Sequence, residues 1–321
     1  MQGVSKIVLN DSYKASDEIM KNWSKSFYKA FSSLPEERFK GVCGLYAYCR
    51  YVDDLVDNDL NNKSEKEINT ELENLEKAVK YIYNKDENFD YEKYIQKFSW
   101  WFAFEDTIKK FKVSEISLLN QLKGQRMDLK FRDLKTVEEL IEYSKFVAGS
   151  VGRMLIPILL HEENYHEDPE VIRACESLGI GMQITNILRD VGEDLRERDR
   201  LYLPEELLEK HSVSREKLKE LSNSKESHNV VVRNIPKNFI KLWEELSDLA
   251  DNFYKAYKDF IGYFHPKSRL SLVAASYIYH SIGDEVRKNE YNCFTKKAYT
   301  SEEKKIKLGL KALEDLKVYE K

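Results

Sequence analysis

Two pairs of aspartates have the residue type and the spacing of a site that binds divalent cations. Asp53 and Asp57 lie four residues apart in CRYVDDLVD, and Asp190 and Asp194 lie four apart in NILRDVGED. Side chains at i and i+4 of a helix are neighbours, about 5–6 Å apart at Cβ, so each pair would bring two carboxylates together. Mg²⁺ prefers such oxygen ligands and commonly shares them with substrate phosphates. The spacing therefore predicts a site for a metal and a diphosphate.

The sequence around these pairs distinguishes them from acidic pairs on a solvated surface. With 56 acidic residues in 321, chance alone gives about ten acidic pairs at this spacing. Each of these two pairs, however, follows an apolar helical stretch, and an arginine, Arg50 or Arg189, lies just upstream. Gln183 and Asn186 precede Asp190 by seven and four residues, on the same helix face. An amide oxygen at that spacing is a further candidate metal ligand.

Other common sites are excluded by their spacing. The histidines at positions 161 and 166 of HEENYH are five residues apart, whereas a zinc-protease helix needs them four apart. The segments GSVG (149–152) and GIG (179–181) do not complete GxGxxG, so we interpret their small residues as points of close helix packing. The four cysteines lack CxxC spacing, which argues against a zinc ribbon or a disulfide framework.

Composition narrows the class of protein. Of the 321 residues 42% are hydrophobic and 34% are charged, a globular balance. The net charge of −4 gives no basic bias, so no nucleic-acid partner is predicted. The longest apolar run, residues 154–160, is far shorter than the roughly 20 residues of a membrane-spanning helix, and the N-terminus lacks the apolar core of a signal peptide. We expect a cytoplasmic protein with reduced thiols.

Helical periodicity extends over nearly the whole chain, and no strand alternation is visible. With only 12 glycines and 6 prolines, few and long elements are expected. Capping-box patterns at Thr136/Glu139 and Thr300/Glu303 predict two helix starts. The predicted helices are 17–33, one that Pro35 opens, 65–84, 90–111, 114–130, one from 136 to about 160, one from 169 through 187 into the 190s, and a final one after 300, with further breaks or starts at Pro204, Pro236 and Pro266. We therefore predict one all-α domain over 1–321, a helical bundle with an elongated apolar cavity.

Several segments of the chain resemble one known family. CRYVDDLVD (49–57) and QITNILRDVGEDLRERDRLYLP (183–204) resemble the two aspartate-rich regions of the squalene/phytoene synthase family. SKSF (24–27) followed by LPEE and YAYCR, VAGSVGRML (147–155) and YIYHSIGDEVRKNEYNCF (277–294) also match, in the expected order. The resemblance covers about residues 15–300.

This resemblance implies the all-α isoprenoid synthase fold and a prenyltransferase that joins two prenyl diphosphates head to head, 1′–1, in two steps. A cyclopropylcarbinyl diphosphate is the intermediate. Mg²⁺, with Mn²⁺ as an alternative, would neutralise the leaving diphosphate as a Lewis acid. The implied metal ligands are Asp53, Asp57, Asn186, Asp190 and Asp194.

The resemblance also implies substrate-binding and catalytic residues. Those expected to be catalytic are Tyr46, Arg50, Arg189 and Tyr279. Those expected to bind substrate are Trp23, Ser24, Lys25, Ser26, Phe27, Tyr46, Arg50, Gln183, Arg189, Tyr202 and Tyr279. Aromatic faces, including that of Phe31, would stabilise an allylic cation in a dry chamber.

Three positions depart from the family pattern. Trp23 stands where a histidine is frequent, and Cys43 stands where a tryptophan often occurs. Gly283 replaces a frequent leucine. We expect Cys43 to widen or lengthen the chamber and Gly283 to leave space as well. None of these changes touches an expected metal ligand.

The expected reaction converts two farnesyl diphosphates, through presqualene diphosphate, to a 30-carbon product of isoprenoid or carotenoid biosynthesis, dehydrosqualene or squalene. Two enzymatic alternatives are a phytoene synthase that uses geranylgeranyl diphosphate and a prenyl diphosphate phosphatase on the same scaffold. A binding protein without turnover is a third. The lack of a dinucleotide motif favours proton loss over reduction by NADPH, although family members that use NADPH lack it too. Because substrate and product are lipids, we expect peripheral contact with a membrane.

Overall fold

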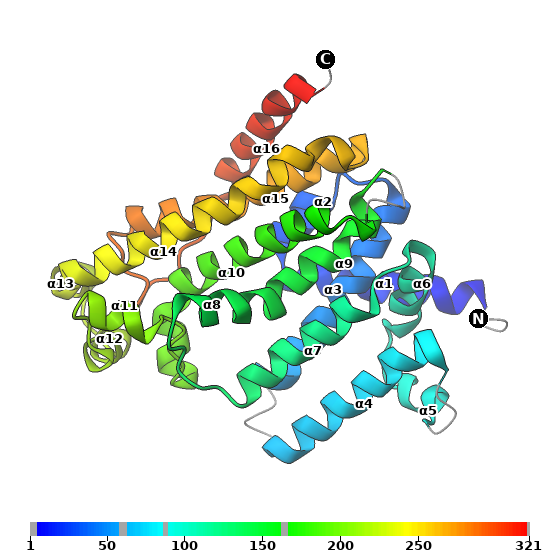
Figure 1. Cartoon of the computed structure of the whole chain (residues 1–321), viewed down its shortest axis with the longest axis horizontal. Coiled ribbons are helices and arrows are strands. Elements are labelled where there is room, and N and C mark those ends of the chain that lie inside the picture. Colours follow the sequence, from blue (N-terminus) through cyan, green and yellow to red (C-terminus); the bar gives the residue numbers. More distant parts are fainter. Residues whose placement is uncertain (1–4, 58–62, 86–88, 162–165, 320–321) are drawn as a thin grey trace.

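The computed structural model describes residues 5–57, 63–85, 89–161 and 166–319, and these residues fold into packed helices (Figure 1). Within them the only extended pairing recorded is an isolated bridge between Leu160 and Phe264. The predicted all-α class is confirmed. Residues 162–165, between the two histidines of HEENYH, and residues 58–62 lie outside the described residues.

The N-terminal helices are α1 (Lys6–Trp23), α2 (Lys25–Phe31) and α3 (Glu36–Asp57). The predicted helix over 17–33 is wrong in its bounds. α1 begins at Lys6, where the Ser5 side chain accepts a hydrogen bond from the Val8 N–H. It ends because Ser24, with φ −141° and ψ 77°, leaves the helical region, and the chain restarts as α2. Pro35 directly precedes α3, as predicted.

The middle of the chain forms α4 (Glu65–Asn84), α5 (Tyr91–Ile95), α6 (Trp101–Phe111) and α7 (Glu115–Leu129). The predictions for 65–84 and 114–130 are confirmed to within a residue. The single helix predicted over 90–111 is wrong, because the chain breaks between Ile95 and Trp101. There Phe98, Trp100 and Trp101 pack into a buried aromatic cluster, and this packing overrides helical continuity.

A bent helix follows, made of α8 (Val137–Ser144), a π-helical turn (Lys145–Gly149) and α9 (Ser150–Leu159). Thr136 caps it as predicted, accepting from the Glu139 N–H at 3.3 Å. The Glu139 carboxylate accepts from the Lys135 N–H instead of from Thr136, so the capping box is shifted by one residue on that side. A π turn widens the backbone locally and often lies at a functional site.

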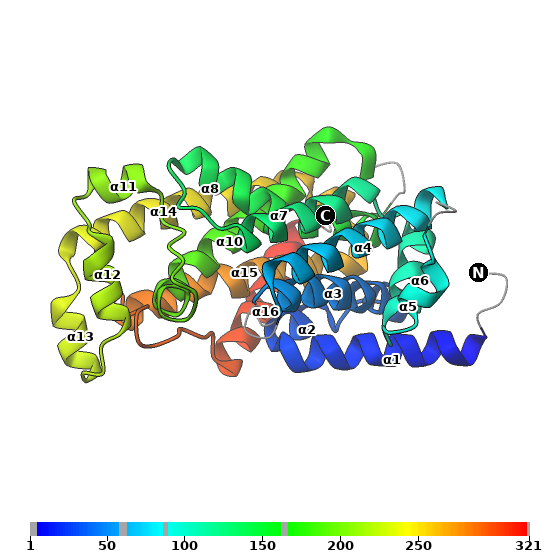
Figure 2. The ribbon, with the colours of Figure 1, turned by 90° about the horizontal axis from the view of Figure 1, so that it is seen from below.

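The next helix, α10 (Pro169–Arg198), runs through the middle of the molecule (Figure 1). Its predicted start at Pro169 is confirmed. The short helices between residues 205 and 234 gather at the end of the molecule away from the N-terminus, and α1 lies along one side (Figure 2). The later elements are α11 (Glu205–Lys210), α12 (Arg215–Ser222), α13 (His228–Asn234), α14 (Lys237–Lys255), a 3-10 helix (Ala256–Tyr263), α15 (Pro266–Lys288), α16 (Glu302–Leu316) and a 3-10 turn (Lys317–Tyr319).

The second predicted capping box is wrong. Ser301, not Thr300, caps α16 by accepting from the Lys304 N–H at 3.2 Å. Thr300 is buried, and its hydroxyl instead lies 3.0 Å from that of Ser281 on α15. A threonine whose hydroxyl is engaged in the core is not available for the helix end.

The small residues that we assigned to helix packing serve that purpose. A Cβ added at Gly152 on α9 would lie 2.3 Å from the carbonyl oxygen of Cys175 on α10. One added at Gly179 on α10 would lie 2.3 Å from that of Ala148 in the π turn. Backbones this close leave no room for a methyl group, so glycine fixes the separation of α9 and α10. None of the helices that the structure describes is both long and apolar enough to cross a bilayer.

Candidate active site

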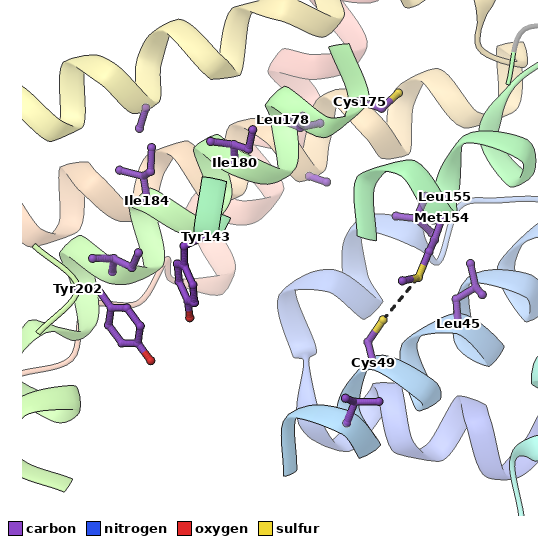
Figure 3. Close-up of a cluster of buried hydrophobic side chains, with 14 of the residues drawn as sticks. Leu45, Cys49, Tyr143, Met154, Leu155, Cys175, Leu178, Ile180, Ile184 and Tyr202 are labelled. Atoms are coloured by element: carbon purple, nitrogen blue, oxygen red, sulfur yellow. Dashed lines mark hydrogen bonds between the residues drawn. The ribbon is translucent and has the colours of Figure 1, made fainter. Parts of the chain in front are cut away.

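A cavity of about 230 Å³ lies between α2, α3, α9, α10 and α15, with the π turn and the 3-10 helix completing its wall. Most of the wall is apolar, and Figure 3 shows part of it, with Cys49 of α3 and Leu155 of α9 on one side and Leu178 of α10 on the other. Such a cavity suits a long hydrocarbon.

The polar part of the wall lies at one end. Asp53 on α3, Gln121 on α7, and Gln183 and Asn186 on α10 line the cavity there. The side-chain amide of Gln125 donates to Oδ1 of Asp53, and that of Gln121 does so at 3.4 Å. The polarity of the wall therefore changes along the cavity: carboxylate and amide oxygens lie at one end, and most of the remaining wall is hydrocarbon.

The two predicted aspartate pairs face each other beside this end, although of the four carboxylates only that of Asp53 lines the cavity itself. Arg198 joins them, because its Nε lies 3.5 Å from Oδ1 of Asp57 and its Nη1 lies 3.5 Å from Oδ1 of Asp194. Arg200 lies 3.2 Å from the same oxygen of Asp57. The sequence predicted the two pairs, and the structure brings them together beside the polar end of the cavity, which we call its mouth. In this structure arginines neutralise the carboxylates.

Burial and mutual repulsion make these carboxylates hard to ionise. Burial, with the nearby charge of Asp57, raises the pKa of Asp53 well above its ordinary value. Burial, with the charge of Asp190, raises the pKa of Asp194 to about 7. Since burial and the neighbouring negative charges both disfavour the ionised carboxylates, a positive group in the mouth would be bound favourably.

Both predicted arginines are held by a neighbouring aspartate. Arg50 donates through Nε to Asp54 at 2.8 Å, and its guanidinium carbon lies 4.1 Å from the ring centre of Trp23. Arg189 donates through Nε to Asp190 at 2.8 Å. Burial lowers the pKa of Arg189, but the hydrogen bond and charge of Asp190 outweigh it and raise that pKa. Both side chains remain charged beside the mouth.

Aromatic rings and hydroxyl groups form the next part of the wall. Ser24, Phe27, Phe31, Tyr46 and Tyr279 all line the cavity. The ring centres of Phe27 and Phe31 are 4.5 Å apart, and those of Phe27 and Tyr46 are 5.9 Å apart. Burial raises the pKa of both tyrosines, so their phenols keep their protons. The break at Ser24, which the sequence did not predict, places this hydroxyl against both phenols.

Not every predicted substrate residue lies on this wall. Trp23 has 59% of its surface exposed and touches the site only through Arg50. Lys25 is exposed, and Ser26 is not among the lining residues. Tyr202 is buried beside the mouth rather than on the cavity wall.

A buried network around Asp128, on α7, was missed by the sequence analysis. Its carboxylate accepts hydrogen bonds from the hydroxyls of Tyr202 at 2.8 Å and Tyr143 at 3.0 Å, and Arg200 Nη1 lies 4.0 Å away. Figure 3 shows the two rings side by side. The spacing of Gln121, Gln125 and Asp128 along one face of a predicted helix was the available signal.

Two expectations about the size of the chamber are wrong. Cys43 is buried but does not line the cavity; its sulfur lies 4.0 Å from Oδ1 of Asp17, on the side of α3 that packs against α1. Gly283 faces α14 instead, where an added Cβ would lie 3.7 Å from the ring of Trp243. Neither small residue enlarges the chamber, because each points into a different helix interface.

The donor set at the mouth fits a divalent cation. Among the residues that the structure describes, no three His, Cys, Asp or Glu side chains already lie together as metal ligands. However, Oδ1 of Asn186 is buried and has no hydrogen-bond partner within the described part of the chain. Asp57 and Asp194 also converge on one positive group. All the available donors are oxygens, as magnesium or manganese prefers.

Comparisons with known proteins agree with this geometry. A model of the squalene/phytoene synthase family matches residues 20–304. The 4,4'-diapophytoene synthase of Staphylococcus haemolyticus is 31% identical over 300 residues, covering 94% of this chain and 95% of that protein. A chloroplastic phytoene synthase of an Oncidium hybrid cultivar is 32% identical over 304 residues, covering 93% of this chain and 67% of that protein. The crystal structure of a dehydrosqualene synthase with a bound ligand superposes with a TM-score of 0.81 at 30% identity, covering 97% of this chain and 98% of the other.

The Asp128 network predicts a specific dependence of stability on pH. Burial raises the pKa of Asp128 to about 6, against about 3.9 in an unfolded chain. As pH rises from about 4 to about 6, the unfolded chain loses this proton first, so ionisation weakens the folded state, and the effect is complete above pH 6. The substitution Asp128→Asn removes the ionisable carboxyl and, with it, this loss of stability. The free energy of unfolding of D128N relative to the unmodified protein should therefore rise across this range, by up to about 3 kcal/mol.

Urea unfolding followed by circular dichroism at several pH values would measure this difference. A difference between the two proteins that stays constant from pH 4 to pH 7 would contradict the assignment of the buried, proton-binding carboxyl to Asp128.

Proposed function

Because the chain belongs to the squalene/phytoene synthase family, whose prenyltransferases join two prenyl diphosphates head to head, we propose that its substrate is farnesyl diphosphate. The product would be a 30-carbon hydrocarbon, dehydrosqualene or squalene, formed through presqualene diphosphate. The observation that carries the proposal is one largely apolar cavity with Asp53 and amide side chains at one end, beside which the two aspartate pairs meet. An amphiphile with a charged head and an apolar tail matches that arrangement.

We propose Mg²⁺, or Mn²⁺, as the cofactor. When bound, it would neutralise the diphosphate and so make it a better leaving group. Arg50 and Arg189, already charged beside the mouth, would exchange an aspartate for phosphate oxygens, because a guanidinium fits both in the same bidentate way. The proposed ligands are Asp53, Asp57, Asn186, Asp190 and Asp194.

The cavity wall would protect the allylic cation left by departing diphosphate. Water would trap such a cation as an alcohol, so the apolar wall has to exclude it. The rings of Phe27, Phe31 and Tyr46 lie on that wall, and aromatic faces attract positive charge. Tyr279 and Tyr46 keep their phenol protons because burial raises the pKa of each, so neither adds a negative charge that would capture the cation. Gln183 and Ser24 supply polar contacts near the head group.

We also propose that the protein lies against a membrane surface through α16, in keeping with a cytoplasmic enzyme of lipid substrates. Ile306, Leu310 and Leu313 are 57%, 62% and 48% exposed. Their spacing of four and three residues places them on one helix face, away from α15. Lys307 and Lys311 lie beside this stripe, as on helices that bind anionic lipid surfaces. Figure 1 shows α16 at the edge of the molecule, where such contact is unobstructed.

Product analysis tests the reaction. The purified protein would be incubated with Mg²⁺ and labelled farnesyl or geranylgeranyl diphosphate, with and without NADPH. We expect a 30-carbon hydrocarbon from farnesyl diphosphate, and the NADPH arms separate squalene from dehydrosqualene. A 40-carbon product formed only from the longer substrate would make the protein a phytoene synthase. Prenyl alcohol alone would indicate a phosphatase, and no conversion of either substrate would indicate a binding protein.

Removing one carboxylate from either helix should abolish the reaction. Asp53→Asn and Asp190→Asn keep the shape of the side chain but remove its charge, and we expect at least about a 100-fold loss of turnover for each. Asp259→Asn, at an exposed position of the 3-10 helix, is the control and should keep full activity. Chelation by EDTA should stop the unmodified enzyme, and added Mg²⁺ or Mn²⁺ should restore it. Normal turnover in both site variants with unchanged circular dichroism would refute the metal assignment.

Vesicle flotation tests the membrane surface. Replacing Ile306, Leu310 and Leu313 together by glutamine should prevent flotation with vesicles of phosphatidylglycerol and phosphatidylcholine, because the apolar stripe is lost. Turnover of detergent-dispersed substrate should be unchanged. Ile116→Gln is a matched control, since this α7 side chain is also 57% exposed. Equal flotation of the triple variant and the unmodified protein would exclude α16 as the contact.

A further inference from the structure

One side chain separates the main cavity from a second cavity. The second cavity, of about 250 Å³ and open to solvent where Val318 is 75% exposed, lies between the 3-10 helix, α15 and the carboxyl end of α16. Tyr257 lines both cavities. It is only 1% exposed and is among the largest fully buried side chains of the described residues. Its ring is therefore a partition between two spaces rather than part of a solid core.

Tyr257 lies at the end of the main cavity opposite the carboxylates. Along α10 the lining residues run from Cys175 to Asn186, and only the latter end carries polar groups. Leu159, at the end of α9, and Phe264 line the same remote end. They are held together because the His265 N–H, next to Phe264, donates to the Leu159 carbonyl at 2.9 Å. The Tyr257 side chain forms part of the wall at this apolar end.

The space behind the ring can receive hydrocarbon. Most of its wall is apolar, formed by Ile261, Val273, Leu316 and Val318 beside Tyr257, and its polar part consists of Lys258, Tyr277 and Asp315. The carboxyl end of α16 is held over it by the Tyr277 hydroxyl, which donates to Oδ2 of Asp315 at 2.6 Å. A chain that passed Tyr257 would therefore enter a second apolar space beneath α16.

From these observations we infer that Tyr257 is a specificity-determining residue that limits the length of the prenyl chain. This inference rests on the proposed function, since it concerns the tail of the proposed substrate. A prenyl chain with its diphosphate at the mouth points its tail toward the remote end, and the Tyr257 ring stops it there. Removing the ring would join the two cavities and make room for one more isoprene unit.

The test compares the binding of two chain lengths. Dissociation constants would be measured for the thiolodiphosphate analogues of farnesyl and geranylgeranyl diphosphate, which do not ionise, together with the products of the natural substrates. Tyr257→Ala opens the partition. Tyr257→Phe keeps the ring, and Val273→Ala enlarges the second cavity alone, so both are controls.

In Tyr257→Ala we expect the affinity for the 20-carbon analogue, relative to the 15-carbon one, to rise about tenfold or more, since a single methylene in an apolar pocket already changes selectivity by 10–200-fold. The ratio should stay within about twofold of the unmodified protein in both controls. Should the alanine variant fail to fold, Tyr257→Leu, which loses less volume, should shift the ratio in the same direction.

An unchanged ratio in a folded Tyr257→Ala or Tyr257→Leu variant would overturn the inference, as would an equal shift in Val273→Ala. The proposed function fails separately, if the unmodified protein binds the analogues but forms no coupled hydrocarbon from either substrate. The binding ratio still tests Tyr257 in that case.

Discussion

Repulsion between carboxylates at the mouth of an apolar cavity is the interaction on which the rest of this site depends. α3 and α10 each present two aspartates to one space, and Asp57 and Asp194 come close enough to share Arg198. In low-dielectric surroundings, like charges at this separation are held only if positive groups stand between them. The protein supplies arginines for this, and bound divalent cations would supply positive charge more compactly. With such cations bound, the mouth would attract the diphosphate head group of a prenyl diphosphate, which the apolar cavity wall would exclude.

Rigid helices maintain this arrangement of charge. The aspartates lie on α3 and α10, and α10 is locked against α9 and the π turn by backbone contacts at Gly152 and Gly179 that admit no side chain. The same contacts close the wall of the cavity, so the device that positions the charged head also excludes water from the tail. Asp128 extends this charged network beside the mouth, because Tyr143 and Tyr202 donate to its carboxylate and Arg200 links it to Asp57.

Residue spacing predicted correctly those features that depend on interactions between residues close together in the sequence. The i, i+4 aspartates, the helix over 65–84 and the glycine contacts could be read from spacing alone. What depends on distant partners could not be read this way. The break at Ser24 and the contact of the Thr300 hydroxyl with that of Ser281 depend on tertiary packing. Cys43 was expected in the chamber because it shares a helix with Tyr46, yet it points toward Asp17. Asp128 stayed hidden because its tyrosine partners lie 15 and 74 residues further along the chain.

The most direct measurement is a crystal structure of the protein with Mg²⁺ and farnesyl thiolodiphosphate. We predict that the diphosphate lies between the Asp53–Asp57 and Asp190–Asp194 pairs, that Arg198 no longer bridges Asp57 and Asp194, and that the prenyl tail runs along the cavity toward Tyr257. A diphosphate bound elsewhere, with Arg198 still between the two carboxylates, would contradict the account.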